Sequence, residues 1–389
     1  MTVWGDLVGQ QRLVARLQAS VAAADDVLRG ERAAAMTHAW LFTGPPGSGR
    51  STAARAFAAA LLCDEGGCGE CLSCRTALAG SHADITRVVT DQAVIRVDAM
   101  RELVRHAALA PAGRRWQVVI VEDADRLNDF AADALLKSIE EPPPRSVWLL
   151  CAPTVEDVLP TIRSRCRAVS LRTPPAAEVA DYLVRRDGVG EPVAIFAARA
   201  SQGHIGRARA LARDEGVRNR RREVLRIPSQ LRDLGSCMTC AANLVDAATE
   251  EAQPQAESLD AKELADLEAA YGAGSRGVKT TGLAAATKEL QRNQKQRVKR
   301  LVRDALDRSL LDLASFYRDV VMVQLRAEGG LVNEEMSQEV ATMSRRTTAE
   351  DSAQRLTAIF AAREALEGEV APMLAMESLM ISLRGGVHD

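Results

Sequence analysis

Between Trp4 and Val169, short apolar runs alternate with longer segments whose apolar residues recur at helical spacing. This alternation is typical of a parallel sheet flanked by helices. Each apolar run is followed by a turn or helix-start signal, which supports its assignment as a strand. The predicted strands are Ala39 to Thr43, Ile85 to Val89, Gln117 to Val121 and Val147 to Cys151.

The strand pattern stops near Pro174, and helical spacing takes over. Helices are predicted at Glu178 to Arg185, Pro192 to Ala200, Leu290 to Gly329 and Ala349 to Leu383. The stretch from about Thr249 to Ala286 is polar and poor in large apolar residues, so we expect it to be partly disordered. The expected fold is α/β plus all-α, with a parallel-sheet domain over residues 1–172, a helical domain over 173–212 and a second helical domain over 213–389 that carries a polar insertion at about 249–286.

The composition limits the number of domains and the classes of partner, and it leaves the predicted fold unchanged. The chain has 389 residues, enough for two or three domains, and a formal net charge of -2. No overall positive field therefore draws it to nucleic acid, and any DNA contact must be local or shared with partners. No apolar stretch approaches the roughly 18 residues of a membrane helix, and the N-terminus has no signal-peptide pattern. We expect a cytoplasmic protein, in which clustered cysteines favour metal binding over disulfides.

A glycine-rich loop follows the first predicted strand and opens a helix, which is the context of a phosphate-binding P-loop. Its backbone N–H groups would hold phosphate oxygens, and Ser51 would face a magnesium ion. The departure from the pattern is Arg50, because a planar guanidinium does not simply replace the compact ammonium of lysine between the β- and γ-phosphates. Binding of ATP and Mg²⁺ can survive this change while catalysis suffers; a turn without a ligand is the alternative. The candidate nucleotide-binding residues here are Gly44, Pro45, Pro46, Gly47, Ser48, Gly49, Arg50, Ser51 and Thr52.

An acidic pair, Glu122 and Asp123, ends the strand that begins at Gln117. In hydrolysing P-loop proteins Asp precedes Glu, the first holding magnesium and the second orienting the attacking water. Here the order is reversed, and Asp123 is one methylene shorter than the expected base. An error of about 1 Å can lower a rate about 100-fold. A second interpretation is that these carboxylates cap the helix that starts near Asn128.

Four cysteines at spacings of five, three and three lie within twelve residues that also contain Gly66, Gly67 and Gly69. The glycines allow tight turns, and four thiolates can surround a tetrahedral zinc with no open position, so we predict a structural Zn²⁺ and exclude a catalytic one. Accidental clustering or disulfide pairing is the alternative. The isolated Cys237 and Cys240 are interpreted as small residues packed on one helical face. The predicted zinc ligands are Cys63, Cys68, Cys71 and Cys74.

Residues 1 to about 210 resemble the clamp-loader branch of the AAA+ ATPases, in which a zinc module follows the P-loop helix. The resemblance rests on long consecutive matches at Trp4 to Gln10, Ala131 to Pro143 and Thr161 to Cys166. It implies an AAA+ domain with a zinc module at 63–74, a helical lid and a C-terminal helical collar. It also implies that the segment containing Val8 helps to form an adenine pocket and that Thr154 is a polar sensor.

The triplet Ser164-Arg165-Cys166 is similar to the arginine-finger motif of that branch. The resemblance implies that Arg165 reaches ATP bound in a neighbouring subunit, where it can stabilise charge on the γ-phosphate. A surface arginine in a salt bridge is the alternative. The second sensor, normally a lid arginine, aligns with Gly206. With Arg50 and the reversed acidic pair, this favours a member that donates a finger while its own nucleotide site is weak or silent.

The leading hypothesis is a clamp-loader subunit with little or no ATPase of its own. The family resemblance implies a hetero-pentamer with gamma/tau and delta subunits, which loads a sliding clamp onto primer-template DNA. It also implies that this complex is part of the DNA polymerase III holoenzyme, which is a DNA-directed DNA polymerase and hence a nucleotidyltransferase. One alternative is a self-sufficient, gamma/tau-like ATPase motor, against which Arg50 and Asp123 argue.

A second alternative is a zinc-dependent DNA-binding module, but Asp64, Glu65 and Glu70 beside the cysteines would repel phosphates. The basic run from Lys288 to Arg303 could contact a DNA backbone, although a solvated helix face is the interpretation we prefer. Outside the pair already described, no carboxylates suggest polymerase or nuclease chemistry.

Overall fold

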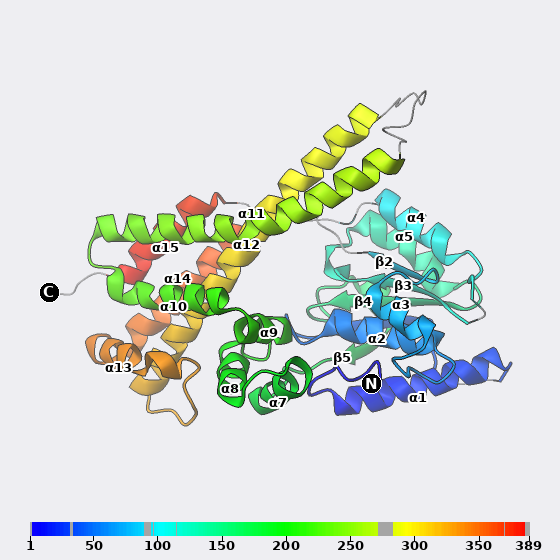
Figure 1. Cartoon of the computed structure of the whole chain (residues 1–389), viewed down its shortest axis with the longest axis horizontal. Helices are drawn as coiled ribbons and strands as arrows, with labels where there is room; N and C mark the ends of the chain where they lie inside the picture. Colours follow the sequence, from blue (N-terminus) through cyan, green and yellow to red (C-terminus); the bar gives the residue numbers. More distant parts are fainter. Residues whose placement is uncertain are drawn as a thin grey trace. The chain divides into compact units, whose positions relative to one another are not determined.

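The computed structural model describes residues 2–31, 34–88, 95, 97–113, 115–270, 283–368 and 370–385. The chain divides into two compact units, Met1–Arg213 and Asp214–Asp389 (Figure 1). Each unit has hydrophobic clusters of its own.

The N-terminal unit is built on a parallel sheet, in which the described residues form five strands in the order β2-β3-β4-β1-β5. These are β1 (Ala39–Thr43), β2 (Ile85–Val88), β3 (Gln117–Val121), β4 (Ser146–Ala152) and β5 (Arg167–Ser170). The predicted α/β class and the four predicted strands are confirmed, except that Val89, the predicted end of β2, lies outside the described residues. The edge strand β5 is absent from the prediction because its four residues carry only two apolar side chains, and only Val169 is buried.

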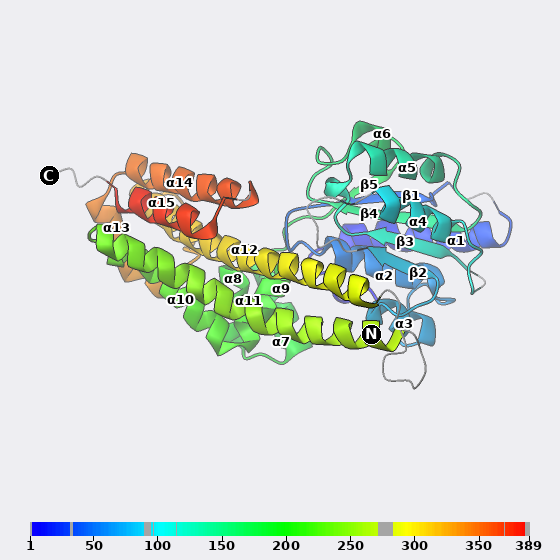
Figure 2. The same ribbon diagram turned by 90° about the horizontal axis from the view of Figure 1, so that it is seen from above.

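Successive side chains of the central strands serve different faces of the sheet. Trp40 and Phe42 of β1 pack in one hydrophobic cluster, and Leu41 between them packs in another. One face is covered by α1 (Gln11–Leu28), α2 (Arg50–Leu62) and α3 (Leu72–Ala79), and the other by α4 (Val97–Ala107) and α5 (Asp129–Glu140) (Figures 1 and 2). Because β1, β3 and β4 are covered on both faces, they are buried along their whole length.

A short helix α6 (Pro160–Arg163) precedes β5, and three helices of the lid region follow it: α7 (Ala176–Asp187), α8 (Glu191–Ala200) and α9 (Ile205–Arg213). The two helices predicted here are present as α7 and α8. Buried Asp187 accepts two hydrogen bonds of 2.9 Å from Arg209 and so joins α7 to α9. The Tyr182 hydroxyl donates to the Asp6 carboxylate at 3.1 Å, which joins α7 to the N-terminal segment.

The C-terminal unit is helical. Its described helices are α10 (Glu215–Gln230), α11 (Leu234–Ala270), α12 (Leu283–Gln324), α13 (Ser337–Arg346), α14 (Ala349–Glu367) and α15 (Pro372–Arg384), with a short η2 (Glu334–Met336). The stretch predicted to be partly disordered is helical on both sides of residues 271–282, which lie outside the described residues. The polar residues of this stretch are used between helices: Arg297 of α12 pairs with Asp260 and Glu263 of α11 at 2.9 and 2.5 Å.

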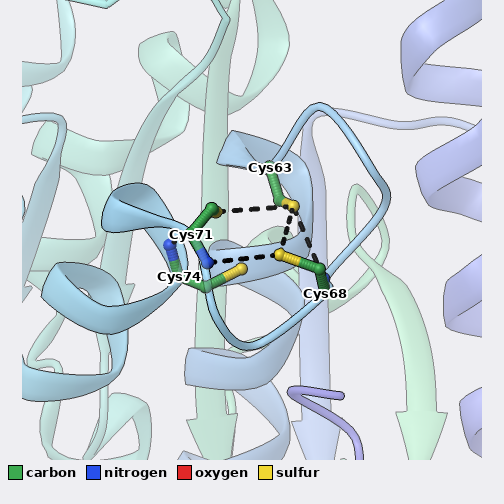
Figure 3. Close-up of side chains that lie close together, drawn as sticks. All are labelled: Cys63, Cys68, Cys71 and Cys74. Atoms are coloured by element: carbon green, nitrogen blue, oxygen red, sulfur yellow. Dashed lines mark hydrogen bonds between the residues drawn. The ribbon is translucent and has the colours of Figure 1, made fainter. Parts of the chain in front are cut away.

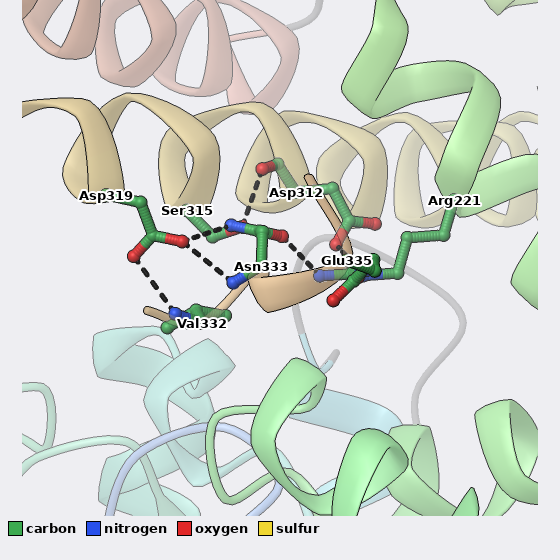
Figure 4. A network of polar contacts seen from close by, with 7 residues as sticks. All are labelled: Arg221, Asp312, Ser315, Asp319, Val332, Asn333 and Glu335. Carbon is green, nitrogen blue, oxygen red and sulfur yellow. Dashed lines mark hydrogen bonds and ion pairs between the residues drawn. The ribbon is translucent and has the colours of Figure 1, made fainter. Parts of the chain in front are cut away.

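A buried polar network ties this unit together (Figure 4). Arg221 of α10 donates to Asp312 of α12 at 3.0 Å and to the Asn333 side chain at 2.5 Å. Buried Asp319 accepts the backbone N–H groups of Val332 and Asn333 at 3.0 and 2.7 Å. Since every bond joins segments distant in sequence, the network fixes α10 and the segment before α13 onto α12.

Candidate functional sites

The four predicted zinc ligands converge between the C-terminal end of α2 and the start of α3 (Figure 3). Their sulfur atoms all lie within 4.8 Å of one another, and Cys63 Sγ is 3.7 Å from the Sγ atoms of both Cys68 and Cys71. A tetrahedral zinc with Zn–S bonds of about 2.3 Å requires sulfur separations of about 3.8 Å. A disulfide requires about 2.05 Å, and all four cysteines are free. The donor set therefore fits a closed tetrahedral metal site.

The turns of the cysteine loop depend on glycine. Gly66, Gly67 and Gly69 have φ angles of 65°, 105° and 83°, in the left-handed region that other residues rarely adopt. A Cβ at Gly67 would also lie 2.6 Å from Val3 Cγ2. These turns place the four cysteines, which are close in sequence, around one centre.

Backbone N–H groups point at the sulfur atoms. Cys63 Sγ accepts from the N–H groups of Glu65 and Cys68 at 3.4 and 3.5 Å. Burial alone would raise the pKa of Cys63, but the backbone hydrogen bonds outweigh it and lower that pKa to about 7. For Cys74, burial dominates and raises the pKa. Cys63 thus becomes a thiolate more readily than Cys74, and metal binding requires thiolates.

The predicted phosphate loop lies at the opposite end of α2. Gly47 and Gly49 have φ angles of 79° and 95°, and Gly44 has 153°. Gly49 is the N-cap of α2 and contributes no side-chain hydrogen bond, so no side chain caps the first-turn N–H groups. The hydroxyl of Ser48 is buried and has no hydrogen-bond partner among the described residues. These features fit an anion.

Two side chains, however, occupy the loop itself. Arg50 Nη1 donates to the Gly44 carbonyl at 2.9 Å, so the guanidinium is turned back on its own loop. The ring of His204, just before α9, lies against Gly47 so closely that a Cβ there would be 2.1 Å from the ring. The N–H of Ile205 also donates to the Gly47 carbonyl at 3.3 Å. His204 could not be predicted from the sequence, because its position depends on how the helices after β5 pack.

The predicted acidic pair lies at the end of β3. Glu122 pairs with Arg87 at 3.3 Å, and Asp123 precedes a short η1 (Ala124–Arg126) without capping it. The interpretation of these carboxylates as caps of α5 is wrong: Asn128 accepts the Ala131 N–H at 2.9 Å and is the cap.

A third carboxylate, Asp125, was not predicted. Burial, with the charge of Asp123, raises its pKa, and the charge of Arg50 acts in the opposite sense. Buried Cys151 of β4 is affected by the same groups: burial, with the charges of Glu122 and Asp123, raises its pKa to about 12, and the charge of Arg50 opposes this. The fold therefore brings the loop arginine and the acidic pair into one electrostatic neighbourhood.

The remaining predicted nucleotide residues are Val8 and Thr154. Val8 lines a cavity of about 270 Å³ together with Gly5 and Tyr182. Thr154 is exposed and closes a local turn, in which its N–H donates to Asp157 at 2.8 Å and its hydroxyl accepts the Asp157 N–H at 3.3 Å. Gly206 offers no side chain at the second sensor position.

Arg165 follows α6 and is held by its own chain. Its Nε pairs with the Glu140 carboxylate at 2.6 Å, and its Nη1 donates to the Thr161 carbonyl at 2.9 Å. The side chains of Arg165 and Glu140 are 41% and 47% exposed. An ion pair this exposed contributes about 0–1 kcal/mol, so the guanidinium can be redirected at small cost.

Residues 23–175 match the protein family described as DNA polymerase III, delta subunit. Over 155 residues the chain is 41% identical to the DNA polymerase III subunit delta' of Pseudomonas aeruginosa, covering 38% of this chain and 47% of that protein. Over 184 residues it is 36% identical to subunit delta' of Escherichia coli, covering 45% and 54%. The N-terminal part of the chain is thus similar to delta' subunits of DNA polymerase III. The resemblance expected from the sequence motifs is thereby confirmed.

The chain is also 34% identical over 187 residues to the subunit gamma/tau of Mycobacterium bovis, covering 47% of this chain and 31% of that protein. The chain spans about half the length of the delta' relatives. A solved gamma subunit-related protein from Thermotoga maritima covers 94% of this chain and 98% of its own at 13% identity and a TM-score of 0.40. Among the described residues, no helix is long and apolar enough to cross a membrane.

Proposed function

We propose that this protein is the delta-prime subunit of a DNA polymerase III clamp loader and acts as its stator. It assembles in the cytoplasm with gamma/tau and delta subunits in a hetero-pentamer and presents Arg165 to ATP in a neighbouring subunit. Through this complex it takes part in loading a sliding clamp onto primer-template DNA. The observation that carries the proposal is the Arg50 guanidinium bound to the Gly44 carbonyl of its own loop.

The nucleotide site supports weak or absent turnover in three independent ways. The Arg50 guanidinium donates to the Gly44 carbonyl and the His204 ring lies against Gly47, so both side chains are already engaged with the loop. The carboxylate at the position of the water-orienting base is Asp123, which is one methylene shorter than Glu, and Gly206 supplies no cation from the lid. ATP and Mg²⁺ would be held by the loop and Ser51 if they bind, and the chain would contribute little to hydrolysis.

Arg165 has the exposure that a finger in trans requires. Its ion pair with Glu140 is a surface contact, and docking of a neighbour can exchange it for a phosphate without burying an unpaired carboxylate. A guanidinium supplied to the γ-phosphate can be worth about 10³–10⁵ in kcat. The finger is therefore the largest catalytic contribution available to this chain.

The cysteine cluster is proposed to hold a structural Zn²⁺. The ion would have four thiolate ligands and no open position for water, so its contribution is to the folding of the loop between α2 and α3. The ion has no part in the proposed ATPase chemistry.

The test is ATP turnover by the purified full chain alone and mixed with gamma/tau and delta subunits, for wild type, Arg165→Ala and Arg163→Ala. The nearby exposed Arg163 is the matched control. We expect negligible turnover alone, and partner-dependent turnover that falls at least about 100-fold in Arg165→Ala but not in Arg163→Ala. Co-purification with the partners shows that each variant still assembles. Robust turnover by the isolated chain, unchanged in Arg165→Ala, would instead support the gamma/tau-like motor.

A further inference from the structure

The distal parts of α11 and α12, residues 249–270 and 283–304, form what we call the arm. The hydrophobic cluster of the C-terminal unit includes residues of α11 only as far as Ala248 and residues of α12 only from Ala305 onward. Val302 packs at the edge of this cluster. Figures 1 and 2 show the arm helices side by side, extending beyond the other helices of this unit. At 1.5 Å per residue each arm helix is about 33 Å long.

The two arm helices have opposite charges. Residues 249–270 contain seven Asp or Glu and one Lys, and residues 283–304 contain seven Lys or Arg and two Asp or Glu. Part of this charge is neutralised between the helices, where Arg297 meets Asp260 and Glu263. Arg297 is buried, so this pairing accounts for the inner face of α12.

The outer face of α12 carries cations of a different kind. Lys288, Arg292, Lys295 and Lys299 follow one another at intervals of four, three and four residues, which places them in one stripe along the helix. Arg297 is nine residues from Lys288, about 180° around the helix. All four stripe residues are exposed, and none forms an ion pair with another described residue. The stripe is thus a linear array of exposed cations about 16 Å long.

We propose that this stripe binds the phosphate backbone of duplex DNA without reading its sequence. The regular row of charges on a straight helix matches a regular row of phosphates. The arm segments 249–270 and 283–304 contain no Phe, Tyr or Trp, so they lack the stacking surfaces with which proteins hold unpaired bases. Because the whole chain has a net charge of -2, no overall positive field adds to the attraction of the stripe.

This contact goes beyond the stator role, since it uses neither Arg165 nor the nucleotide loop. The test is the binding of a fluorescently labelled duplex of mixed sequence to the full chain, as a function of salt. The stripe variant changes Lys288, Arg292, Lys295 and Lys299 to Gln. The control variant removes the same charge from exposed residues of α10 and α13 by changing Arg222, Arg226, Arg345 and Arg346 to Gln.

Wild type and control should bind the duplex with a steep salt dependence. In the stripe variant the slope of log K against log salt should fall by about 3 to 4, with an affinity loss of about tenfold or more. The proposal is overturned if wild type shows no salt-dependent binding, if the control loses as much as the stripe variant, or if single-stranded DNA or poly-glutamate binds the stripe more tightly than duplex. The stripe variant should keep its partner-dependent ATP turnover without DNA, and Arg165→Ala should keep duplex binding, so either proposal can fail alone.

Discussion

The helix α2 has a glycine-rich loop at each end, and the two loops differ in how complete their sites are. At the C-terminal end, four sulfur atoms lie within 4.8 Å of one another, at separations that suit a zinc ion. At the N-terminal end, the loop has the backbone turns of a phosphate site, but Arg50 and His204 occupy it. A motif in the sequence is therefore a better guide to the path of the backbone than to the function of the loop.

The difference follows from where the deciding residues come from. The cysteine site is made within twelve residues, so the spacing of its ligands and glycines nearly determines it. The state of the phosphate loop depends on His204, more than 150 residues away in the sequence, and on the direction taken by one arginine side chain. Changes at the two ends of α2 should accordingly have different consequences.

The largest expected effect is at the cysteine end. Cys71→Ser should abolish stoichiometric zinc and lower the free energy of unfolding by about 3 kcal/mol or more, because the binding free energy of a structural zinc is folding free energy. Metal analysis of the purified chain and denaturant unfolding measure the two effects. Cys240→Ser, at a buried cysteine outside the cluster, is the control and should retain its metal. A Cys71→Ser chain with full zinc content would contradict the closed four-cysteine site.

The next effect tests whether the nucleotide end is blocked by two side chains only. Combining Arg50→Lys with His204→Ala removes the guanidinium from the Gly44 carbonyl and the ring from Gly47. Affinity for ADP or an ATP analogue, measured calorimetrically, should rise about tenfold or more, or about 1.4 kcal/mol. Turnover should remain low because Asp123 is still too short.

Arg55→Lys is the matched control for this gain, since Arg55 lies one turn further along α2 and donates to the Ser51 carbonyl. Its nucleotide affinity should equal that of wild type. If the double variant binds no better than Arg55→Lys, the loop is inactive for a reason other than these two side chains.

For the rest of the fold, the success of prediction from sequence also depends on whether the cause of an element is local or distant in the chain. The buried strands and the lid helices α7 and α8 were predictable, because their apolar patterns are local. The edge strand β5 and the arm could not be predicted. β5 buries a single residue, and the arm is stabilised by partners such as Arg297 and Asp260, which a polar composition does not reveal.

The candidate site shows the same limit. The position of each motif could be read from the chain, and the cysteine cluster forms as expected. Three features could not be predicted, because each depends on how β3, α5 and α6 come together. They are the contribution of Asp125, the pairing of Arg165 with Glu140, and the cap at Asn128. Side-chain partners across elements are set by packing, and spacing along the sequence does not encode them.

The smallest predicted effect is the pH dependence of stability at the cysteine end of α2. In the metal-free chain, the pKa of Cys63 is lowered from 9.0 to about 7 by backbone N–H groups that outweigh burial. Since the unfolded chain then binds more protons, stability should rise with pH between about 7 and 9 and be lost as the pH falls through 7. Denaturant unfolding of wild type and Cys63→Ser over this window measures it. The gap between them should widen in favour of wild type as the pH rises; a gap that stays constant would mean that the N–H groups do not stabilise a thiolate.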